Sequence, residues 1–189
     1  MITILPYRSG WPDEFLRYAA DLRSALGSLA LRIDHIGSTA VPGLAAKDII
    51  DIQITVAALE PAVEEALNPA GYTRIVRITQ DHIPPGGPAD LDQWTKWFFR
   101  PPAGARPANI HVRLAGRANQ RYAVLFRDYL RTHPAAAAAY AQVKSALAGY
   151  PADDMDAYYA VKDPVCDIIM AGAEAWAAET GWQPGPSDG

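Results

Sequence analysis

A glycine-serine-threonine turn and two polar residues on a later strand are the features of this chain best suited to chemistry. Gly37 allows a conformation or a close approach that a side chain would block, and Ser38 and Thr39 offer hydroxyls and neighbouring N–H groups. If a short helix begins there, its N-terminus can bind an anion. Asp51 and Gln53 are two residues apart, so on a strand they point to the same face. The pattern predicts an anion-binding turn beside a polar strand face.

The surroundings of Asp51 predict that its carboxylate is buried. Isoleucines at positions 49, 50, 52 and 54 indicate a strand that is covered on both faces. An unpaired carboxylate in such a place is costly. We therefore expect Asp51 to meet a metal ion, a cation or N–H donors.

A second candidate strand, NIHVRL at residues 109–114, carries His111 and Arg113 at alternate positions. Both side chains face away from Ile110 and Val112, so they either line a pocket or pack against other elements. An imidazole favours Zn²⁺, Mn²⁺ and other transition metals, and a guanidinium suits phosphates and carboxylates. Arg113 is therefore a candidate partner for an anion.

The elements that position these residues follow from hydrophobic periodicity and from proline and glycine punctuation. Strands are expected at residues 2–5, 29–36, 48–56, 73–78, 94–100 and 109–114. Helices are expected at residues 13–26, 59–68, 119–131, 134–149, 153–162 and 163–178, the last with Asp163 and Pro164 as its N-cap and first residue. The Pro- and Gly-rich segment 80–92 is expected to be a loop. This order predicts an α+β fold: a mixed β-sheet with helices packed on it and a helical C-terminal third.

Size and composition suit one domain, which we place at residues 1–178, followed by a flexible tail at 179–189. The net charge of −4 and the absence of a Lys/Arg run argue against a large nucleic-acid footprint. One cysteine, Cys166, excludes an internal disulfide and favours a cytoplasmic location. No stretch has the pattern of a signal peptide or the length of a membrane span. A small-molecule partner is expected, and the sequence does not indicate an oligomeric state.

Five segments of the chain together resemble the GrpB family, whose small proteins are related to nucleotidyltransferases. They are PYRSGWPDEF, RIDHIGSTAVPGLAAKDIIDI, NIHVRL, LFRDYLRTHP and YYAVKDPVCDIIMAGAEAW, and the resemblance covers about residues 5–176. In the nucleotidyltransferase fold, the glycine-serine turn holds nucleotide phosphates, and acids on the following strand and a later strand hold Mg²⁺. In some bacteria a similar domain is fused to dephospho-CoA kinase, which implies a link to nucleotide or cofactor metabolism.

This chain departs from the catalytic pattern that the resemblance implies. Gln53 stands at the second acid position, and the later strand offers His111, with Asn109 two residues before it. The expected catalytic group is therefore Asp51, Gln53 and His111. Asp51 and His111 are the expected ligands of a divalent metal ion, Mg²⁺ or Mn²⁺ with Zn²⁺ as the alternative. Two-metal phosphoryl transfer needs several carboxylates, so the usual nucleotidyl-transfer route is in doubt.

The other predicted site residues each have a structural alternative. The substrate-binding group is His35, Gly37, Ser38, Thr39, Lys47, Arg113, Arg127 and Lys162. His35 either lines the site or fixes the turn. Arg127 either grips a phosphate or carboxylate or pairs with a neighbouring acid, and Lys162 either reaches the pocket or is solvated. Asp81 and His82 are either ligand or lid groups on their loop, or part of an exposed turn.

Three functions remain open from the sequence. The first is a nucleotidyltransferase-like enzyme that binds a nucleotide or another phosphate-bearing small molecule, with a divalent metal. The second is a non-catalytic module that binds such a metabolite, which Gln53 favours. The third is a ligase or hydrolase that uses a His-containing metal site on the same scaffold.

Overall fold

Alternating apolar and polar residues give the central sheet two different faces. Strand β2 (Ile50–Val56) points its isoleucines to one face and Asp51, Gln53 and Thr55 to the other. Strand β5 (Ala108–Leu114) lies parallel to β2, and the two have the same alternation. Asp51 is aligned with Asn109 in this pairing, and Gln53 with His111. The polar residues of both strands therefore share one face.

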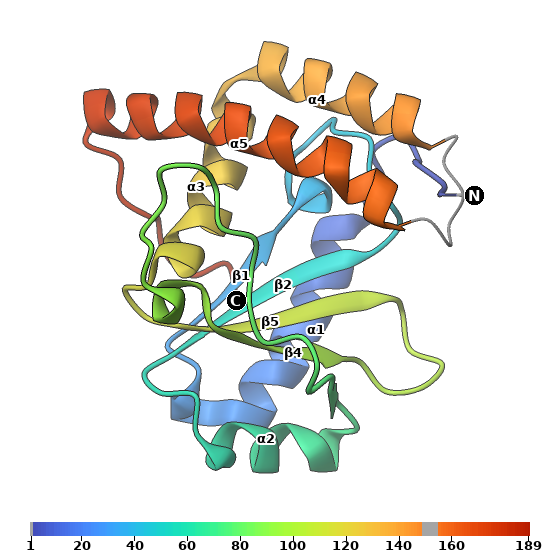
Figure 1. Ribbon diagram of the computed structural model, residues 1–189. Coiled ribbons are helices and arrows are strands. Elements are labelled where there is room, and N and C mark those ends of the chain that lie inside the picture. Colours follow the sequence, from blue (N-terminus) through green and yellow to red (C-terminus); the bar gives the residue numbers. More distant parts are fainter. Residues whose placement is uncertain (1, 149–154) are drawn as a thin grey trace.

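The computed structural model describes residues 2–148 and 155–189, in which five strands form one mixed sheet (Figure 1). The strand order is β1 (Arg32–Ile36), β2, β5, β4 (Lys96–Arg100) and β3 (Thr73–Arg74). β2 and β5 are parallel, and the other neighbours in this sheet are antiparallel. Short 3₁₀ turns lie at Gly27–Leu29 (η1), Ser38–Ala40 (η2), Asn68–Ala70 (η3) and Leu91–Trp94 (η4).

Two helices, α1 (Trp11–Leu26) and α2 (Pro61–Leu67), cover the apolar face of the sheet. Pro12 occupies the first turn of α1, where the missing N–H leaves no hydrogen bond unmade. The buried face of α1 packs on the isoleucines of β2 and on the apolar residues of β5. This cluster is the main hydrophobic core, and it fixes the strands that carry the polar residues.

The opposite face is covered by α3 (Ala118–Thr132), α4 (Pro134–Leu147) and α5 (Met155–Thr180), as Figure 1 shows. α3 touches the sheet, and α4 and α5 pack on α3 and on each other. The predicted α+β fold, with a mixed sheet and a helical C-terminal third, is confirmed. Within the described residues, no helix combines the length and the apolar character that a membrane crossing requires.

Four predicted elements differ from the structure. Residues 2–5 form a single bridge from Leu5 to Ala46. The strand predicted at 73–78 ends at Arg74, because a turn closed by the Ile78 N–H and the Ile75 carbonyl oxygen interrupts it before the chain pairs again with Thr95 at Gln80. The two helices predicted at 153–162 and 163–178 are one helix, α5, with Pro164 inside it. Proline removes one helical hydrogen bond, but packing of α5 on α3 and α4 holds both halves in line. Residues 153 and 154, where the first of these was predicted to begin, lie outside the described residues.

The tail after α5 returns to the open edge of β1. Ser187 Oγ accepts a hydrogen bond from the N–H of Ile33 and donates one to its carbonyl oxygen, both at 2.9 Å. The Asp188 carboxylate accepts a hydrogen bond from the N–H of His35 at 3.0 Å and pairs with Arg127. The flexibility of residues 179–189 stays a prediction, but in this structure the last three of them are attached to the sheet.

Candidate functional site

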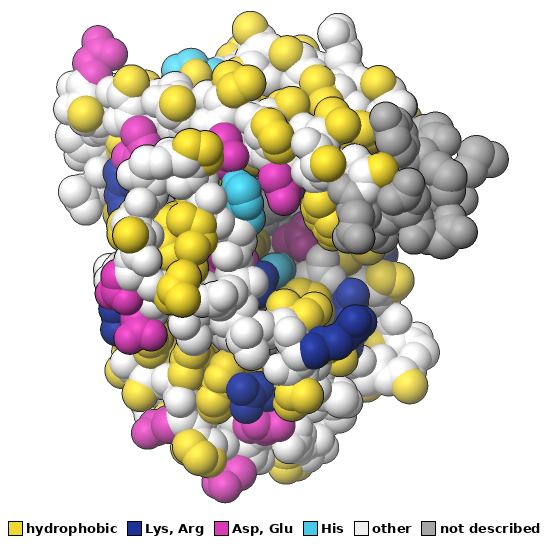
Figure 2. Space-filling view, viewed as in Figure 1, with side chains coloured by type: hydrophobic (Ala, Val, Ile, Leu, Met, Phe, Trp, Pro, Cys, Tyr) yellow, Lys and Arg dark blue, Asp and Glu magenta, His cyan; other side chains and the backbone are white. Residues whose placement is uncertain are grey.

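A cavity of about 260 Å³ lies between the polar face of the sheet and helices α3 and α5. Figure 2 shows it as a hollow with acidic, basic and histidine side chains at its floor. Its lining includes six of the residues predicted from the sequence: Gly37, Ser38, Asp51, His111, Arg113 and Lys162. These residues come from four separate segments of the chain, so the fold brings together most of the predicted group.

Gly37 is required at its position because Asp51 lies directly against it. Its φ angle of +69° is in the region that favours glycine. A Cβ at this position would lie 2.9 Å from Cβ of Asp51 and still closer to a carboxylate oxygen. The turn and the acid of the opening pattern are therefore in contact, on the same side of the sheet.

Asp51 faces the cavity with one neutral partner. The Asn109 side-chain amide donates a hydrogen bond to Oδ1 at 2.7 Å. Burial raises the pKa of the Asp51 carboxyl above its ordinary value, against the hydrogen bond from Asn109 and the charge of Lys162, which lower it. Asp51 therefore keeps its proton to a higher pH than an exposed aspartate does.

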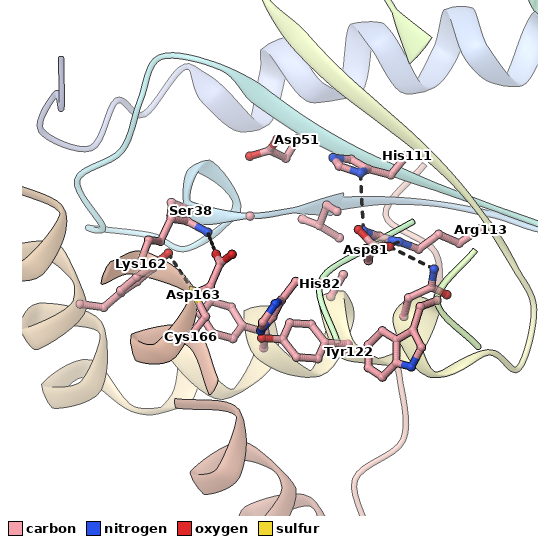
Figure 3. A pocket seen from close by; sticks show the side chains of 17 residues that line it. Ser38, Asp51, Asp81, His82, His111, Arg113, Tyr122, Lys162, Asp163 and Cys166 are labelled. Atoms are coloured by element: carbon pink, nitrogen blue, oxygen red, sulfur yellow. Dashed lines mark hydrogen bonds and ion pairs between the residues drawn. The ribbon is translucent and has the colours of Figure 1, made fainter. Parts of the chain in front are cut away.

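His111 is held neutral, and within the described residues its Nε2–H is the donor left for a ligand. Its Nδ1 lies 3.4 Å from Nζ of Lys96 and 3.5 Å from a guanidinium nitrogen of Arg113. Both neighbours can only donate, so we assign Nδ1 as the acceptor and place the proton on Nε2. Burial lowers the pKa of His111 well below its ordinary value, and the Arg113 and Lys96 charges lower it further. Figure 3 shows the ring lying between Asp51 and Arg113.

Two lysines approach the Ser38 end of the cavity. Lys162 lines the cavity, and its Nζ lies 3.7 Å from the Asp163 carboxylate. Lys144 is 3% exposed and donates hydrogen bonds to Ser38 Oγ, at 2.9 Å, and to the carbonyl oxygen of Ala45. Burial, followed by repulsion from Lys162, lowers the pKa of Lys144 to about 7. Ser38 is therefore set between a pocket and a lysine that loses its proton near neutral pH.

Asp81 fills the centre of a buried charge network beside the cavity. Its carboxylate pairs with Arg113 at 2.8 and 2.9 Å and with Lys96 at 2.6 Å, and accepts a hydrogen bond from Asn119 at 3.0 Å. Burial opposes the charge, but the Arg113 and Lys96 cations hold the pKa of Asp81 far below its usual range. Asp81 thus does not belong to an exposed turn: it lines the cavity and is the counter-ion of Arg113 and Lys96, a role that neither sequence-based alternative described. Its neighbour His82 also lines the cavity and lies 3.1 Å from the Asp167 carboxylate of α5.

Arg113 and Gln53 belong to this network and have few groups left for a ligand. The third donor of Arg113 binds Gln53 Oε1 at 2.6 Å, and Gln53 Nε2 donates to the carbonyl oxygen of Gln120 at 3.1 Å. Gln53 is fully buried and is not part of the cavity lining. Its side chain points to the same face of β2 as Asp51, as predicted. It is covered by α3, however, and so does not reach the cavity.

Four other predicted binding residues also lie away from the cavity lining. His35 stacks on Phe15 of α1, with ring centroids 4.7 Å apart, and its Nε2 is 3.0 Å from Thr39 Oγ1. Both are buried on the apolar side, and burial lowers the pKa of His35 to about 3. This geometry agrees with the second of the two roles expected for His35, that of a histidine that fixes the turn. The Lys47 ammonium lies 3.8 Å from the centre of the Tyr158 ring.

Arg127 is the last of these residues, and its guanidinium is occupied within the protein. It is 3% exposed and pairs with Asp128 and Asp188. It also donates to the carbonyl oxygen of His35 at 3.0 Å. Arg127 thus fastens α3 to β1 and to the tail.

The donor set does not fit the metal site that the fold implies. Asp51 contributes one carboxylate. The Gln53 side chain accepts a hydrogen bond from Arg113, in the charge network around Asp81, and does not face the cavity. Coordination by His111 Nε2 would move its proton to Nδ1, against two cations. Among the described residues, no three His, Cys, Asp or Glu side chains are grouped to hold a metal ion. Metal binding by Asp51 and His111 stays a prediction that this geometry does not favour.

Sequence reasoning missed Lys144 and left the role of Asn109 unassigned. The spacing along α4 was a usable signal for Lys144. Ala137, Tyr140 and Leu147 lie seven, four and three residues from it on the same helix face, and all three are buried. The contact from Asn109 to Asp51 depends on the parallel pairing of β2 and β5, which the sequence did not indicate.

Comparison with known proteins places the whole chain in a family. The family described as "GrpB protein" matches residues 1–171. A UPF0157 protein of Halalkalibacterium halodurans is 35% identical over 92% of this chain and 83% of its own length. A crystal structure of the GrpB protein from Enterococcus faecalis is 28% identical, with a TM-score of 0.70 over 92% of this chain and 99% of that one.

Longer relatives match as well. A protein of Mycolicibacterium paratuberculosis named dephospho-CoA kinase is 40% identical over 97% of this chain and 48% of its own length. The chain thus spans about half the length of these curated relatives. The family match, the full-length relatives and the shared fold agree with the motifs noted in the sequence. The chain belongs to the GrpB family.

Proposed function

We propose that the chain binds a small phosphate-bearing molecule of the nucleotide class in the cavity between the sheet and helices α3 and α5. The observation that carries the proposal is the convergence of donors on one space. The Ser38 hydroxyl, the Lys162 ammonium and the Nε2–H of His111 belong to side chains that line the same cavity. Such donors suit phosphate oxygens, and hydrogen bonds to charged groups are the stronger kind.

The remaining polar groups give the pocket its electrostatic balance. Arg113 is committed to Asp81, so Lys162 is the main charge left for a phosphate. Its pKa is lowered by burial but raised overall by Cys166 and Asp163, so Lys162 stays protonated at neutral pH. Burial raises the pKa of Asp51, so its neutral form is more accessible than that of an exposed aspartate, and that form can donate a hydrogen bond to a phosphate oxygen.

The names of the longer relatives support a nucleotide-related ligand. They are called dephospho-CoA kinases, and the name describes an activity on a nucleotide-like substrate. Because this chain spans about half of those proteins, their activity is not transferred to it. The donor set favours recognition over nucleotidyl transfer by two metal ions, which needs several carboxylates together. Of the two strand positions where the resemblance implies acids on β2, one holds Asp51 and the other holds Gln53, and Asp81 is paired with Arg113 and Lys96.

Calorimetric titration with ATP, CTP, GTP, UTP and pyrophosphate tests this proposal. We expect at least one of them to bind, and Lys162→Met to weaken that binding roughly ten- to hundredfold, because it removes a charged hydrogen bond. Lys47→Met is the matched control: it removes a nearby lysine that rests on Tyr158, so we expect little change. Absence of heat from every ligand in folded protein, or an equal loss in both variants, would contradict the proposal.

A further inference from the structure

The contact between Ser38 and Lys144 has a chemistry that ligand binding alone does not need. Ser38 Oγ and Lys144 Nζ are 2.9 Å apart, and Ser38 lines the cavity. Lys144 is buried and donates its other hydrogen bond to the Ala45 carbonyl oxygen. Within the described residues, no carboxylate lies within ion-pair distance of its ammonium. A buried lysine without a counter-ion is poised to give up its proton.

We propose that Ser38 is a nucleophile and Lys144 its general base, and that the pair accepts a phosphoryl group from the phosphate-bearing ligand. This inference rests on the proposed function for its substrate class. A neutral amine at Lys144 can donate to Ala45 and accept the hydroxyl proton of Ser38 at the observed distance. Serine paired with lysine is a recognised variant of the serine–base arrangement.

The step balances with groups already in the cavity. Ser38 Oγ forms a bond to phosphorus, and the bond from phosphorus to the leaving oxygen breaks with its electron pair on that oxygen. The hydroxyl proton moves to Nζ of Lys144, whose ammonium then lies beside the new phosphoserine. Lys162 and the Nε2–H of His111 face the same cavity and can stabilise the charge on the phosphoryl oxygens.

The electrostatic surroundings of Lys144 suit this role. Lys162 and Cys166 of α5 and Asp51 of β2 act on it from other elements, and the Tyr140 ring centre of α4 lies 4.5 Å from its Nζ. Burial and the Lys162 charge together outweigh the opposing effects, so the pKa of Lys144 falls to about 7. A large fraction of the amine is therefore neutral at neutral pH, as a general base requires.

Covalent labelling by a fluorophosphonate tests the pair directly. This probe has an electrophilic phosphorus, and its fluoride leaves when a serine attacks. We expect mass spectrometry to find the adduct on Ser38, and the labelling rate to rise about tenfold per pH unit below the pKa of Lys144 and to level off above it. The rate is measured between pH 6 and pH 9 on the full chain.

Three variants separate a base from a mere contact. Lys144→Met and Lys144→Arg should each lower the labelling rate at least about a hundredfold, because neither side chain accepts a proton at neutral pH. Lys144→Arg keeps a cation beside Ser38, so it guards against loss of folding, which circular dichroism also checks. Ser145→Ala changes the next residue of α4, whose hydroxyl bonds to Ala141, and should label at the wild-type rate.

The inference is overturned if folded wild-type protein is not labelled at Ser38, or if Lys144→Arg lowers the rate less than tenfold. Calorimetry keeps this result separate from the proposed function. Nucleotide binding without labelling would leave the binding proposal standing and remove the nucleophile. Labelling at Ser38 without binding of any nucleotide or of pyrophosphate would support the nucleophile and contradict the binding proposal.

Discussion

At the scale of single residues, Gly37 meets two separate demands at one position. Its φ angle of +69° disfavours any side chain, and Asp51 occupies the space where a Cβ would lie. The first demand is a backbone cost, and the second is a steric cost that also moves the acid of the candidate site. A comparison with Gly43, where φ is +78° and no atom lies within 4 Å of a built Cβ, separates them.

We predict that Gly37→Ala both destabilises the protein and weakens ligand binding. At Gly37 a positive φ is combined with a ψ of −169°, a conformation that is nearly restricted to glycine. This backbone costs about 1–3 kcal/mol, and the clash with Asp51 adds about 1–3 kcal/mol in the free energy of unfolding. Gly43→Ala carries the backbone cost alone and should bind ligand as the wild type does. Urea denaturation and calorimetry measure both quantities. Equal stability and equal binding in the two variants would show that Asp51 does not depend on this glycine.

Residue-level prediction succeeded where the spacing is local. Asp51 faces the cavity because alternation along β2 determines its side of the sheet. It was less successful for Gln53, because alternation along a strand predicts the face of the sheet but not which helix covers a side chain on that face. The side of the sheet that His35 faces follows from the pairing of β1 with β2, which the sequence alone left open.

At the scale of elements, Asp81 ties the loop between β3 and β4 to the sheet. Asp81 enters the protein and pairs with Lys96 and Arg113, whose side chains are 9% and 6% exposed. Removing a partner from a buried ion pair leaves an uncompensated charge, which is far more costly than the pair is stabilising. Asp81 therefore couples the loop to strands β4 and β5, next to the floor of the cavity.

We predict that Asp81→Asn lowers the free energy of unfolding by about 3–5 kcal/mol at pH 7. The pKa of Asp81 is lowered in the folded state, so its stabilising effect is present above the unfolded pKa of about 4 and is lost as the pH falls below it. The difference between wild type and variant should therefore shrink at pH 3. Guanidinium denaturation at the two pH values measures it.

Asp92→Asn is the matched control on the same loop. Asp92 is exposed, and its backbone N–H donates a hydrogen bond to the Asp90 carboxylate at 3.1 Å. Its substitution should change stability by less than about 0.5 kcal/mol. If Asp81→Asn behaves like this control at pH 7, the network does not hold the loop.

Element-level prediction from the sequence was accurate for strongly periodic segments. Helix α1 and strands β2, β4 and β5 lie where the alternation placed them, within a few residues. Pro164 misled the prediction because a proline after an aspartate is the usual start of a helix. Tertiary packing of α5 overrides that local signal, and no single-sequence pattern reports such packing.

At the scale of the whole molecule, the fold turns one face of its sheet into core and the other into a site. The apolar face is sealed by α1 and α2, and the polar face meets the helices of the C-terminal third. The sequence predicted the fold class and the order of the elements from α1 to α4, because both follow from periodicity. It could not predict the cavity partners that α4 and α5 supply, since these depend on how the helices dock on the sheet.

The central claim is that one cavity beside Asp51 holds a phosphate-bearing ligand between the sheet and the helices. A crystal structure of the protein grown with pyrophosphate tests it most directly. We predict density for the ligand within hydrogen-bond distance of Ser38 Oγ, Lys162 Nζ and His111 Nε2. Pyrophosphate bound elsewhere on the protein, with this cavity filled only by water, would contradict the claim.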